Sequence, residues 1–128
     1  METSMPTALE APSREHLVTF DNLSPGRDYT IEINCPEFTS VCPITGQPDF
    51  GTIVYSYVPD QLCVELKSLK LYLQRFRNQG IFYEQVVNLL LDDFVARVQP
   101  RHCTVTGSFT PRGGLTSKVV CTHTAAKK

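Results

Sequence analysis

The stretch QLCVELKSLKLYLQRFRNQGIFYEQVVNLLLDDFVARVQP, residues 61–100, contains two helical patterns in direct succession. Apolar residues recur at helical spacing in both halves. In the first half they are Leu62, Leu66, Leu69, Leu73 and Phe76, and in the second half Phe82, Val86, Leu89, Leu90 and Phe94. Gly80 stands where a glycine is expected to end the first helix, and Pro100 lies just beyond the second. The sequence therefore predicts a pair of consecutive helices that opens after Pro59-Asp60.

Two strand patterns precede this helical pair and two follow it. Residues 29–35, YTIEINC, alternate strictly between apolar and polar, and residues 50–58, FGTIVYSYV, are rich in β-branched and aromatic side chains. Residues 102–110 and 115–124 are the later strands, and PRGG between them is a hairpin-like connection. The order β-β-α-α-β-β predicts an α+β fold, in which a helical hairpin covers one face of a four-stranded antiparallel sheet.

The other face and the edges of such a sheet need cover that this chain does not supply. An uncovered edge strand invites pairing with another chain. We therefore expect subunits to join edge to edge into a homo-oligomer, as a closed barrel without free edges.

Composition limits the class of protein. With 128 residues, the chain is long enough for one domain, expected over residues 21–128 after an arm over residues 1–20. The net charge of −1 provides no field that would draw the protein to nucleic acid or to anionic lipid. We find no signal peptide and no apolar run of membrane-spanning length. The five cysteines are an odd number without a C-x-x-C pair, so we expect reduced thiols and a cytoplasmic location.

The loop VCPITGQPDFGT, residues 41–52, contains the first candidate site. A proline directly after Cys42 frees the following backbone amides to point at the thiol, which favours the thiolate. Gly46 and Pro48 shape the loop so that Asp49 can turn back toward Cys42 and manage a proton. From spacing alone, a small buried cysteine and a turn-forming aspartate explain the same residues equally well.

The remaining cysteines are interpreted as small apolar residues, and these are Cys35, Cys63, Cys103 and Cys121. Two of them lie on the apolar phase of a strand, and Cys63 is expected to open the first helix. His102 and His123 stand apart from any partner set, so no metal site is predicted.

Two further candidate sites lie on the helices. Lys67 and Lys70 project from one polar face with Ser68 between them, and the cluster can hold phosphates or can be a solvated surface. Glu84 lies in the first turn of the second helix, where a carboxylate is stabilised by the helix N-terminus. A carboxylate there can also accept two N–H bonds from a guanine-like base, with Tyr83 stacking on the same ring.

Three segments together resemble a known family: EFTSVCPITGQPDFGTIVYSYVPD, VELKSLKLYLQRFRNQGIFYE and FTPRGG. They resemble the QueF nitrile reductases, which are the NADPH-dependent 7-cyano-7-deazaguanine reductases of queuosine biosynthesis, in their short single-module form. The likeness runs from about Pro25 to about Gly114. It implies the tunnelling fold, in which β-β-α-α-β-β subunits form ring-shaped barrels, as pentameric rings or decamers, with active sites at subunit boundaries.

The resemblance also implies roles for particular residues. Cys42 attacks the nitrile carbon to form a thioimide, Asp49 supplies the proton, and NADPH reduces the adduct to 7-aminomethyl-7-deazaguanine. The residues implied to bind the base are Glu84, Tyr83 and Glu65. Those implied to bind NADPH are Lys67, Ser68, Lys70 and Arg112. One position departs from the family, because its members commonly carry a histidine where this chain has Tyr83.

Two alternatives keep the fold and change the function. One is a non-catalytic purine-binding protein, for which Glu84 and the barrel suffice. The other is an amidinotransferase-type relative that processes the same nitrile with an amine donor, and the intact ELKSLKLY segment, residues 65–72, argues against it.

Overall fold

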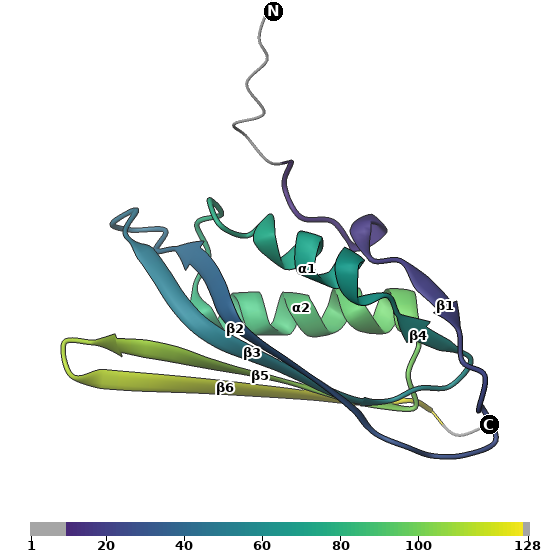
Figure 1. Cartoon of the computed structure of the whole chain (residues 1–128). Helices are drawn as coiled ribbons and strands as arrows, with labels where there is room; N and C mark the ends of the chain where they lie inside the picture. Colours follow the sequence, from purple (N-terminus) through teal and green to yellow (C-terminus); the bar gives the residue numbers. More distant parts are fainter. Residues whose placement is uncertain (1–9, 127–128) are drawn as a thin grey trace, which may run out of the picture.

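The computed structural model describes residues 10–126 of the chain, and Figure 1 shows their arrangement. The elements, in chain order, are a 3-10 helix Arg14–His16, β1 Thr19–Asp21, β2 Ile31–Val41, β3 Pro48–Val58, β4 Leu62–Val64, α1 Leu66–Gln74, α2 Tyr83–Val98, β5 His102–Arg112 and β6 Leu115–Thr124. Neither helix in this part of the chain is long and apolar enough to cross a membrane.

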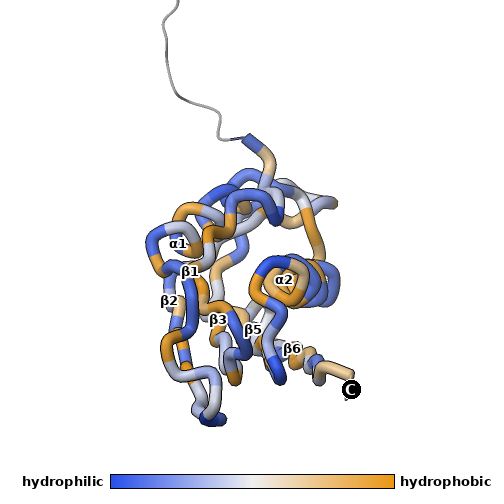
Figure 2. Tube along the Cα trace, turned by 90° about the vertical axis from the view of Figure 1, so that its right-hand side faces the viewer, coloured by the Kyte–Doolittle hydropathy of each residue, from blue (hydrophilic) through white to orange (hydrophobic). Residues whose placement is uncertain are grey.

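The predicted sheet is confirmed. Four antiparallel strands lie in the order β2-β3-β5-β6, and both helices cover the same face of the sheet (Figures 1 and 2). β6 has the predicted bounds, and β5 continues two residues beyond its predicted end. The β5–β6 hairpin turns through Gly113 and Gly114, whose φ angles of 57° and 81° are in the left-handed region that this kind of tight turn requires.

β2 is longer than predicted. The sequence prediction ended this strand at Cys35, but the structure continues it to Val41. The register shifts between Cys35 and Phe38, so Pro36 falls in an irregular stretch where a missing backbone N–H is tolerated. The strand then resumes with Phe38 buried in the core, which carries the sheet up to the cysteine loop.

α1 starts later than predicted. The helical spacing placed Leu62 and Cys63 in the helix, and this was wrong, because residues 62–64 form β4 and pair with β1. Helix formation begins only after Glu65, whose side chain caps the first turn. Leu66, which fits the helical spacing of the apolar residues, is 59% exposed. A long-range strand pairing has overridden the local helical pattern.

The expected arm is part of the fold from Ser13 onward. Leu17 is completely buried, and the guanidinium Nε of Arg14 donates to Asp93 Oδ1 at 3.1 Å. Asp93 is itself buried in α2 and accepts a second bond, from the hydroxyl of Tyr72, at 2.6 Å. This carboxylate therefore joins the N-terminal segment to both helices.

The core lies between the two helices and the sheet. Phe94 of α2 packs on Tyr55 and Tyr57 of β3, each with ring centroids 4.9 Å away. The predicted inward residues Val86 and Leu90 are fully buried, whereas Phe82 is half exposed. Phe82 is exposed because it precedes α2 as its N-cap residue rather than lying within the helix.

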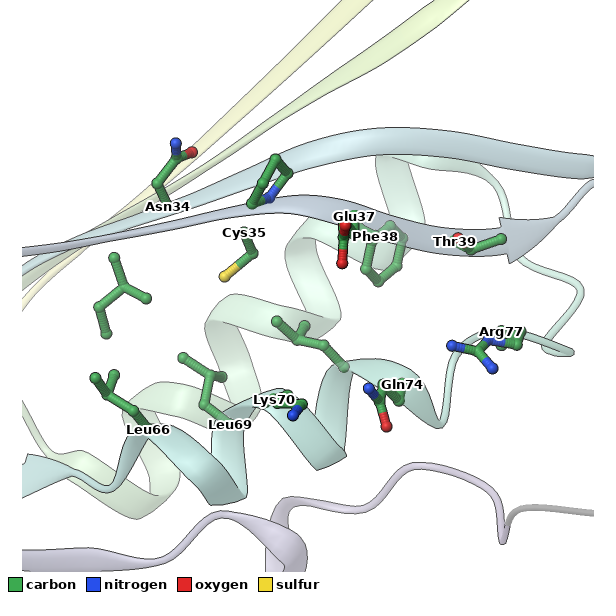
Figure 3. A pocket seen from close by; sticks show the side chains of 13 residues that line it. Asn34, Cys35, Glu37, Phe38, Thr39, Leu66, Leu69, Lys70, Gln74 and Arg77 are labelled. Atoms are coloured by element: carbon green, nitrogen blue, oxygen red, sulfur yellow. The ribbon is translucent and has the colours of Figure 1, made fainter.

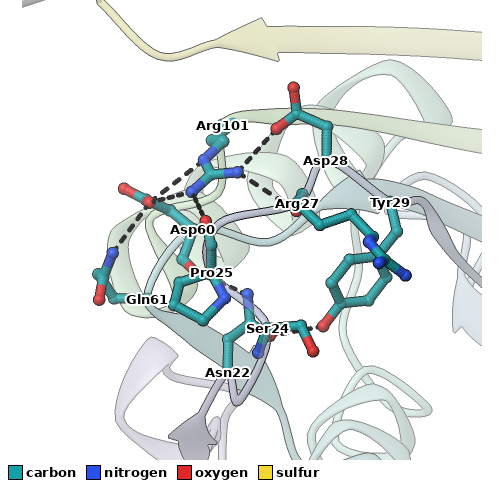
Figure 4. Close-up of polar contacts among 9 residues, drawn as sticks. All are labelled: Asn22, Ser24, Pro25, Arg27, Asp28, Tyr29, Asp60, Gln61 and Arg101. Atoms are coloured by element: carbon teal, nitrogen blue, oxygen red, sulfur yellow. Dashed lines mark hydrogen bonds and ion pairs between the residues drawn. The ribbon is translucent and has the colours of Figure 1, made fainter.

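Arg101 lies at the end of the molecule that is far from the cysteine loop (Figure 1). Its side chain binds the loop that precedes β2 (Figure 4). Its guanidinium donates to Asp28 Oδ1 at 2.7 Å and to Asp60 Oδ1 at 3.0 Å. It also donates to the carbonyl oxygens of Pro25 and Arg27. A planar guanidinium with five donors suits this bridging role. The network holds the turn at Pro25-Gly26 in place.

Candidate active site

The cysteine loop connects β2 and β3. The backbone N–H of Cys42 donates to Gln47 O at 2.9 Å, and Gly46 N donates to Cys42 O at 2.8 Å. Gly46 has φ 73°, a conformation that favours glycine. These contacts close the loop into a compact turn behind the thiol.

The turn lowers the pKa of the Cys42 thiol from its ordinary value of 9.0. The largest cause is the backbone N–H of Thr45, which donates to the sulfur. The Thr45 hydroxyl and the Ile44 N–H act in the same direction. Partial burial and the negative charge of Asp49 oppose the shift. The structure thus contains the amide-lined turn that the Cys-Pro sequence predicts.

Other thiols of the chain show the opposite behaviour. Burial raises the pKa of Cys35 to about 11 and that of Cys103 to about 12. The pKa of Cys121 is raised as well, by burial first and by Asp92 second. A thiol in these surroundings stays protonated and is a poor nucleophile at neutral pH. The electrostatics therefore set Cys42 apart from these three cysteines.

The segment between the helices fixes the position of the cysteine loop. Val41 N donates to Gln79 O at 3.0 Å, and Ile81 N donates to Val41 O at 3.1 Å. Gly80, between Gln79 and Ile81, lies against Pro43. The prediction that Gly80 ends the first helix was wrong, because α1 already stops at Gln74 and Gly80 contacts the loop instead.

Asp49 lies on β3 directly after the loop and faces the helices. It is only 5% exposed, and the hydroxyl of Tyr83 donates to its Oδ1 at 3.0 Å. Its charge acts on Cys42, so the two side chains share one neighbourhood. Three residues predicted for the site, Cys42, Asp49 and Tyr83, are brought together from a loop, a strand and a helix N-terminus.

Phe109 of β5 belongs to this cluster, although the sequence analysis did not single it out. Its ring stacks on Tyr83 with centroids 3.9 Å apart and planes 9° from parallel. Two strand glycines leave room for that ring, because a Cβ at Gly51 would lie 2.7 Å from Phe109 Cδ1 and one at Gly107 would lie 3.0 Å from Phe109 Cε2. Glycine within a strand is a known sign of such a close approach, and it was the available signal in the sequence.

Replacing Gly51 with alanine should destabilise the protein by about 1–3 kcal/mol, the usual cost of overpacking. The new methyl group would also meet the backbone carbonyl of Ser108, at 2.9 Å, which cannot move aside as a side chain can. Chemical denaturation measures the loss. Gly26→Ala is the matched control, because a Cβ there meets nothing within 4 Å. Equal stability of the two variants would contradict the crowding at Gly51.

Glu84 lies in the first turn of α2, next to Tyr83, and is exposed to solvent. The residue before the helix, Phe82, provides no side-chain cap for the first amides of α2. The Glu84 carboxylate is therefore accessible to solvent, whereas that of Asp49 is buried. Glu84 lies at the end of α2 that faces the cysteine loop.

A cavity of about 430 Å³ lies between α1 and β2 (Figure 3). Lys70, Gln74 and Arg77 line it from α1 and the turn after the helix, and Cys35 and Glu37 line it from β2. Two cations and an amide thus line one hollow, together with the Glu37 carboxylate and several apolar side chains. Such donors suit the phosphates of a nucleotide.

Glu65 and Ser68 have partners within the chain. Glu65 caps α1 by accepting from Lys67 N at 2.7 Å and from Ser68 N at 2.9 Å. The buried Ser68 hydroxyl accepts from Val18 N at 2.9 Å and donates to Glu65 O at 2.7 Å. Lys67 is exposed. The residues of the ELKSLKLY segment therefore differ in role. Glu65 and Ser68 stabilise the start of α1 through bonds within the chain, whereas the lysines are exposed.

Arg112 is the last residue of β5, and its side chain lies outside the described part of the structure. Among residues 10–126, no group of three or more His, Cys, Asp or Glu side chains is arranged to hold a metal ion.

These features define a class: a tunnelling-fold protein with an activated thiol next to a buried carboxyl group. A family model described as QueF-like protein matches residues 48–128. Over 113 residues the chain is 66% identical to the NADPH-dependent 7-cyano-7-deazaguanine reductase of Rhodopirellula baltica, covering 88% of this chain and 93% of the relative. It is 62% identical over 112 residues to the reductase of the same name from Chlorobium phaeovibrioides, covering 88% and 97%. The chain belongs to the QueF family.

A solved structure supports the fold. The crystal structure of the archaeosine synthase QueF-Like in its apo form superposes with a TM-score of 0.67 at 22% identity, covering 78% of this chain and 96% of that one. At this identity the likeness speaks for the fold alone.

Proposed function

We propose that this protein is an NADPH-dependent nitrile reductase of the cytoplasm that converts 7-cyano-7-deazaguanine to 7-aminomethyl-7-deazaguanine for queuosine biosynthesis in tRNA modification. The observation that carries the proposal is the Cys42 thiol, whose pKa is lowered by the amides of its own loop next to the buried Asp49. The names of the two relatives supply the substrate and the reductant.

The first chemical step is nucleophilic addition of the Cys42 thiolate to the substrate. A nitrile is a poor hydride acceptor, and addition of the Cys42 sulfur to the nitrile carbon forms a C–S bond while one π electron pair moves to nitrogen. That nitrogen must gain a proton as its charge develops. Asp49 is the proposed carrier: it takes up the proton that leaves the Cys42 thiol and passes it to the nitrogen. The product of this step is a thioimide, a more electrophilic C=N carbon held on Cys42.

NADPH, when bound, supplies the hydrides that reduce this carbon to the aminomethyl level. Lys67 and Lys70 are the proposed phosphate contacts, and the cavity beside α1 adds Arg77 to them. The fit rests on the size of this hollow and on the cations that line it. Ser68 and Arg112 stay predictions for the same role, and the observed bonds of Ser68 hold the helix that presents the lysines.

The base is proposed to bind next to the loop. Glu84 is the proposed acceptor of two N–H bonds from the polar edge of the deazaguanine, and its exposure in the first turn of α2, next to Tyr83, supports this role. Glu65 and Tyr83 remain proposed contacts of the base. Both also have bonds within the chain.

The assembly is proposed to be a homo-oligomeric ring, in pentamers or decamers. β2 and β6 are the outer strands of the sheet, so their free edges are where neighbouring subunits would pair. Pairing there would close the sheets of several subunits into a barrel.

The decisive experiment mixes the protein with the nitrile and NADPH and follows NADPH oxidation. We expect two NADPH oxidised for each nitrile, because reduction of a nitrile to an amine takes four electrons. An amidinotransferase-type relative would form the covalent adduct without consuming NADPH. A purine-binding protein would do neither, and either result would contradict the proposal.

A further inference from the structure

Tyr83 takes part in two contacts that together restrict it. Its hydroxyl donates to Asp49 Oδ1 at 3.0 Å, and its ring lies flat against Phe109 with centroids 3.9 Å apart. A phenol has few rotatable bonds, so a ring held on one face aims its hydroxyl in one direction. The direction observed here is toward the carboxyl group assigned as the proton donor.

Phe109 is itself held by the sheet. It is 4% exposed, and the absence of side chains at Gly51 and Gly107 lets its ring lie close to the strands. Gly51 is the register partner of Phe109 across β3 and β5. A continuous path of contacts thus runs from the strand glycines through two stacked rings to Asp49.

The consequence for Asp49 follows from its surroundings. Its backbone lies in β3, and its register partner on the adjacent strand β2 is Ser40. A carboxyl group that must protonate a nitrogen on the Cys42 adduct has to keep one orientation, because small displacements of a catalytic group cost large factors in rate. A hydrogen bond from an immobilised phenol provides that constraint.

We propose that Tyr83, seated on Phe109, is a positioning residue that fixes the Asp49 carboxyl group next to Cys42. The inference rests on the proposed function, because it assigns Tyr83 a task in thioimide formation. It differs from the role expected from the sequence, in which Tyr83 contacts the deazaguanine directly.

A double-mutant cycle separates these two roles. The variants are Tyr83→Phe, which keeps the stacked ring and removes the hydroxyl, Asp49→Asn, and the pair combined. The measured quantities are the single-turnover rate of thioimide formation and the affinity for 7-deazaguanine, which has the base but no nitrile.

If Tyr83 acts through Asp49, Tyr83→Phe slows thioimide formation between about 10-fold and 100-fold. Its affinity for 7-deazaguanine stays within about twofold of the unaltered protein. In the Asp49→Asn background the same substitution has no further effect, because the group that it positions is already absent. Phe109→Leu should slow the same step, since it removes the flat surface that aims the hydroxyl.

Tyr29→Phe is the matched control, because it removes a phenol bond of 2.6 Å to Asn22 at the far end of the molecule. It should leave thioimide formation unchanged. An unchanged rate in Tyr83→Phe would overturn this inference alone. A tenfold loss of affinity for 7-deazaguanine, with the same extra loss in the Asp49→Asn background, would also overturn it in favour of a hydrogen bond from the Tyr83 hydroxyl to the base. Absence of any adduct in the unaltered protein would overturn the proposed function and this inference together.

Discussion

Replacing Cys42 with alanine should abolish the covalent adduct and lower nitrile-dependent NADPH oxidation by at least about 10⁴-fold. Removal of a nucleophile from a covalent mechanism costs factors of this order, because no other group can take its place. Intact-protein mass spectrometry with the nitrile reports the adduct, and the absorbance of NADPH reports turnover.

Cys121→Ala is the matched control for this result. Cys121 is another partly buried cysteine, but burial and Asp92 raise its pKa. Its removal should leave both the adduct and the turnover intact. A Cys42→Ala protein that still oxidised NADPH with the nitrile would refute covalent catalysis by this residue.

Replacing Asp49 with asparagine should move two measurements in opposite directions. Thioimide formation should slow by about 10²–10³-fold, because proton transfer by a positioned acid contributes a factor of this order. Alkylation of Cys42 at a fixed pH near neutrality should become faster. The sign follows from the charge: Asp49 raises the pKa of Cys42, so its neutralisation lowers that pKa further and increases the thiolate fraction.

This opposition excludes the trivial explanation that the substitution damages the loop. A disordered loop would lose the amide contacts to the sulfur, and the thiolate fraction would fall. Alkylation and adduct formation would then both become slower. Stopped-flow absorbance of the thioimide and timed iodoacetamide labelling supply the two rates. A variant with unchanged thioimide formation would rule out proton donation by Asp49.

The features that local sequence could predict are those that depend on neighbouring residues. The alternation in residues 29–35 and the helical spacing around Val86, Leu90 and Phe94 predicted a sheet and a helix that the structure contains. The Cys42-Pro43 pair predicted amides directed at the thiol, and these belong to the next few residues of the same turn.

The features that could not be predicted depend on partners far away in the chain. Leu62 fits the helical spacing of α1, but it pairs with residues 19–21 as part of β4 and therefore lies in a strand. Ser68 stands between two lysines, a pattern that does not distinguish a phosphate ligand from a hydroxyl bonded to Val18. Phe109 is one aromatic residue among several in the strands, and only the register with Gly51 reveals its place next to Tyr83.

The most direct test is the pH dependence of alkylation of each cysteine in the folded protein, read by peptide mass spectrometry after iodoacetamide labelling. Cys42 should react with a midpoint below 9.0, while Cys35 and Cys103, with pKa values of about 11 and about 12, stay unmodified near neutral pH. A midpoint for Cys42 at or above 9.0, or labelling no faster than that of the buried thiols, would contradict the thiolate on which nitrile capture depends.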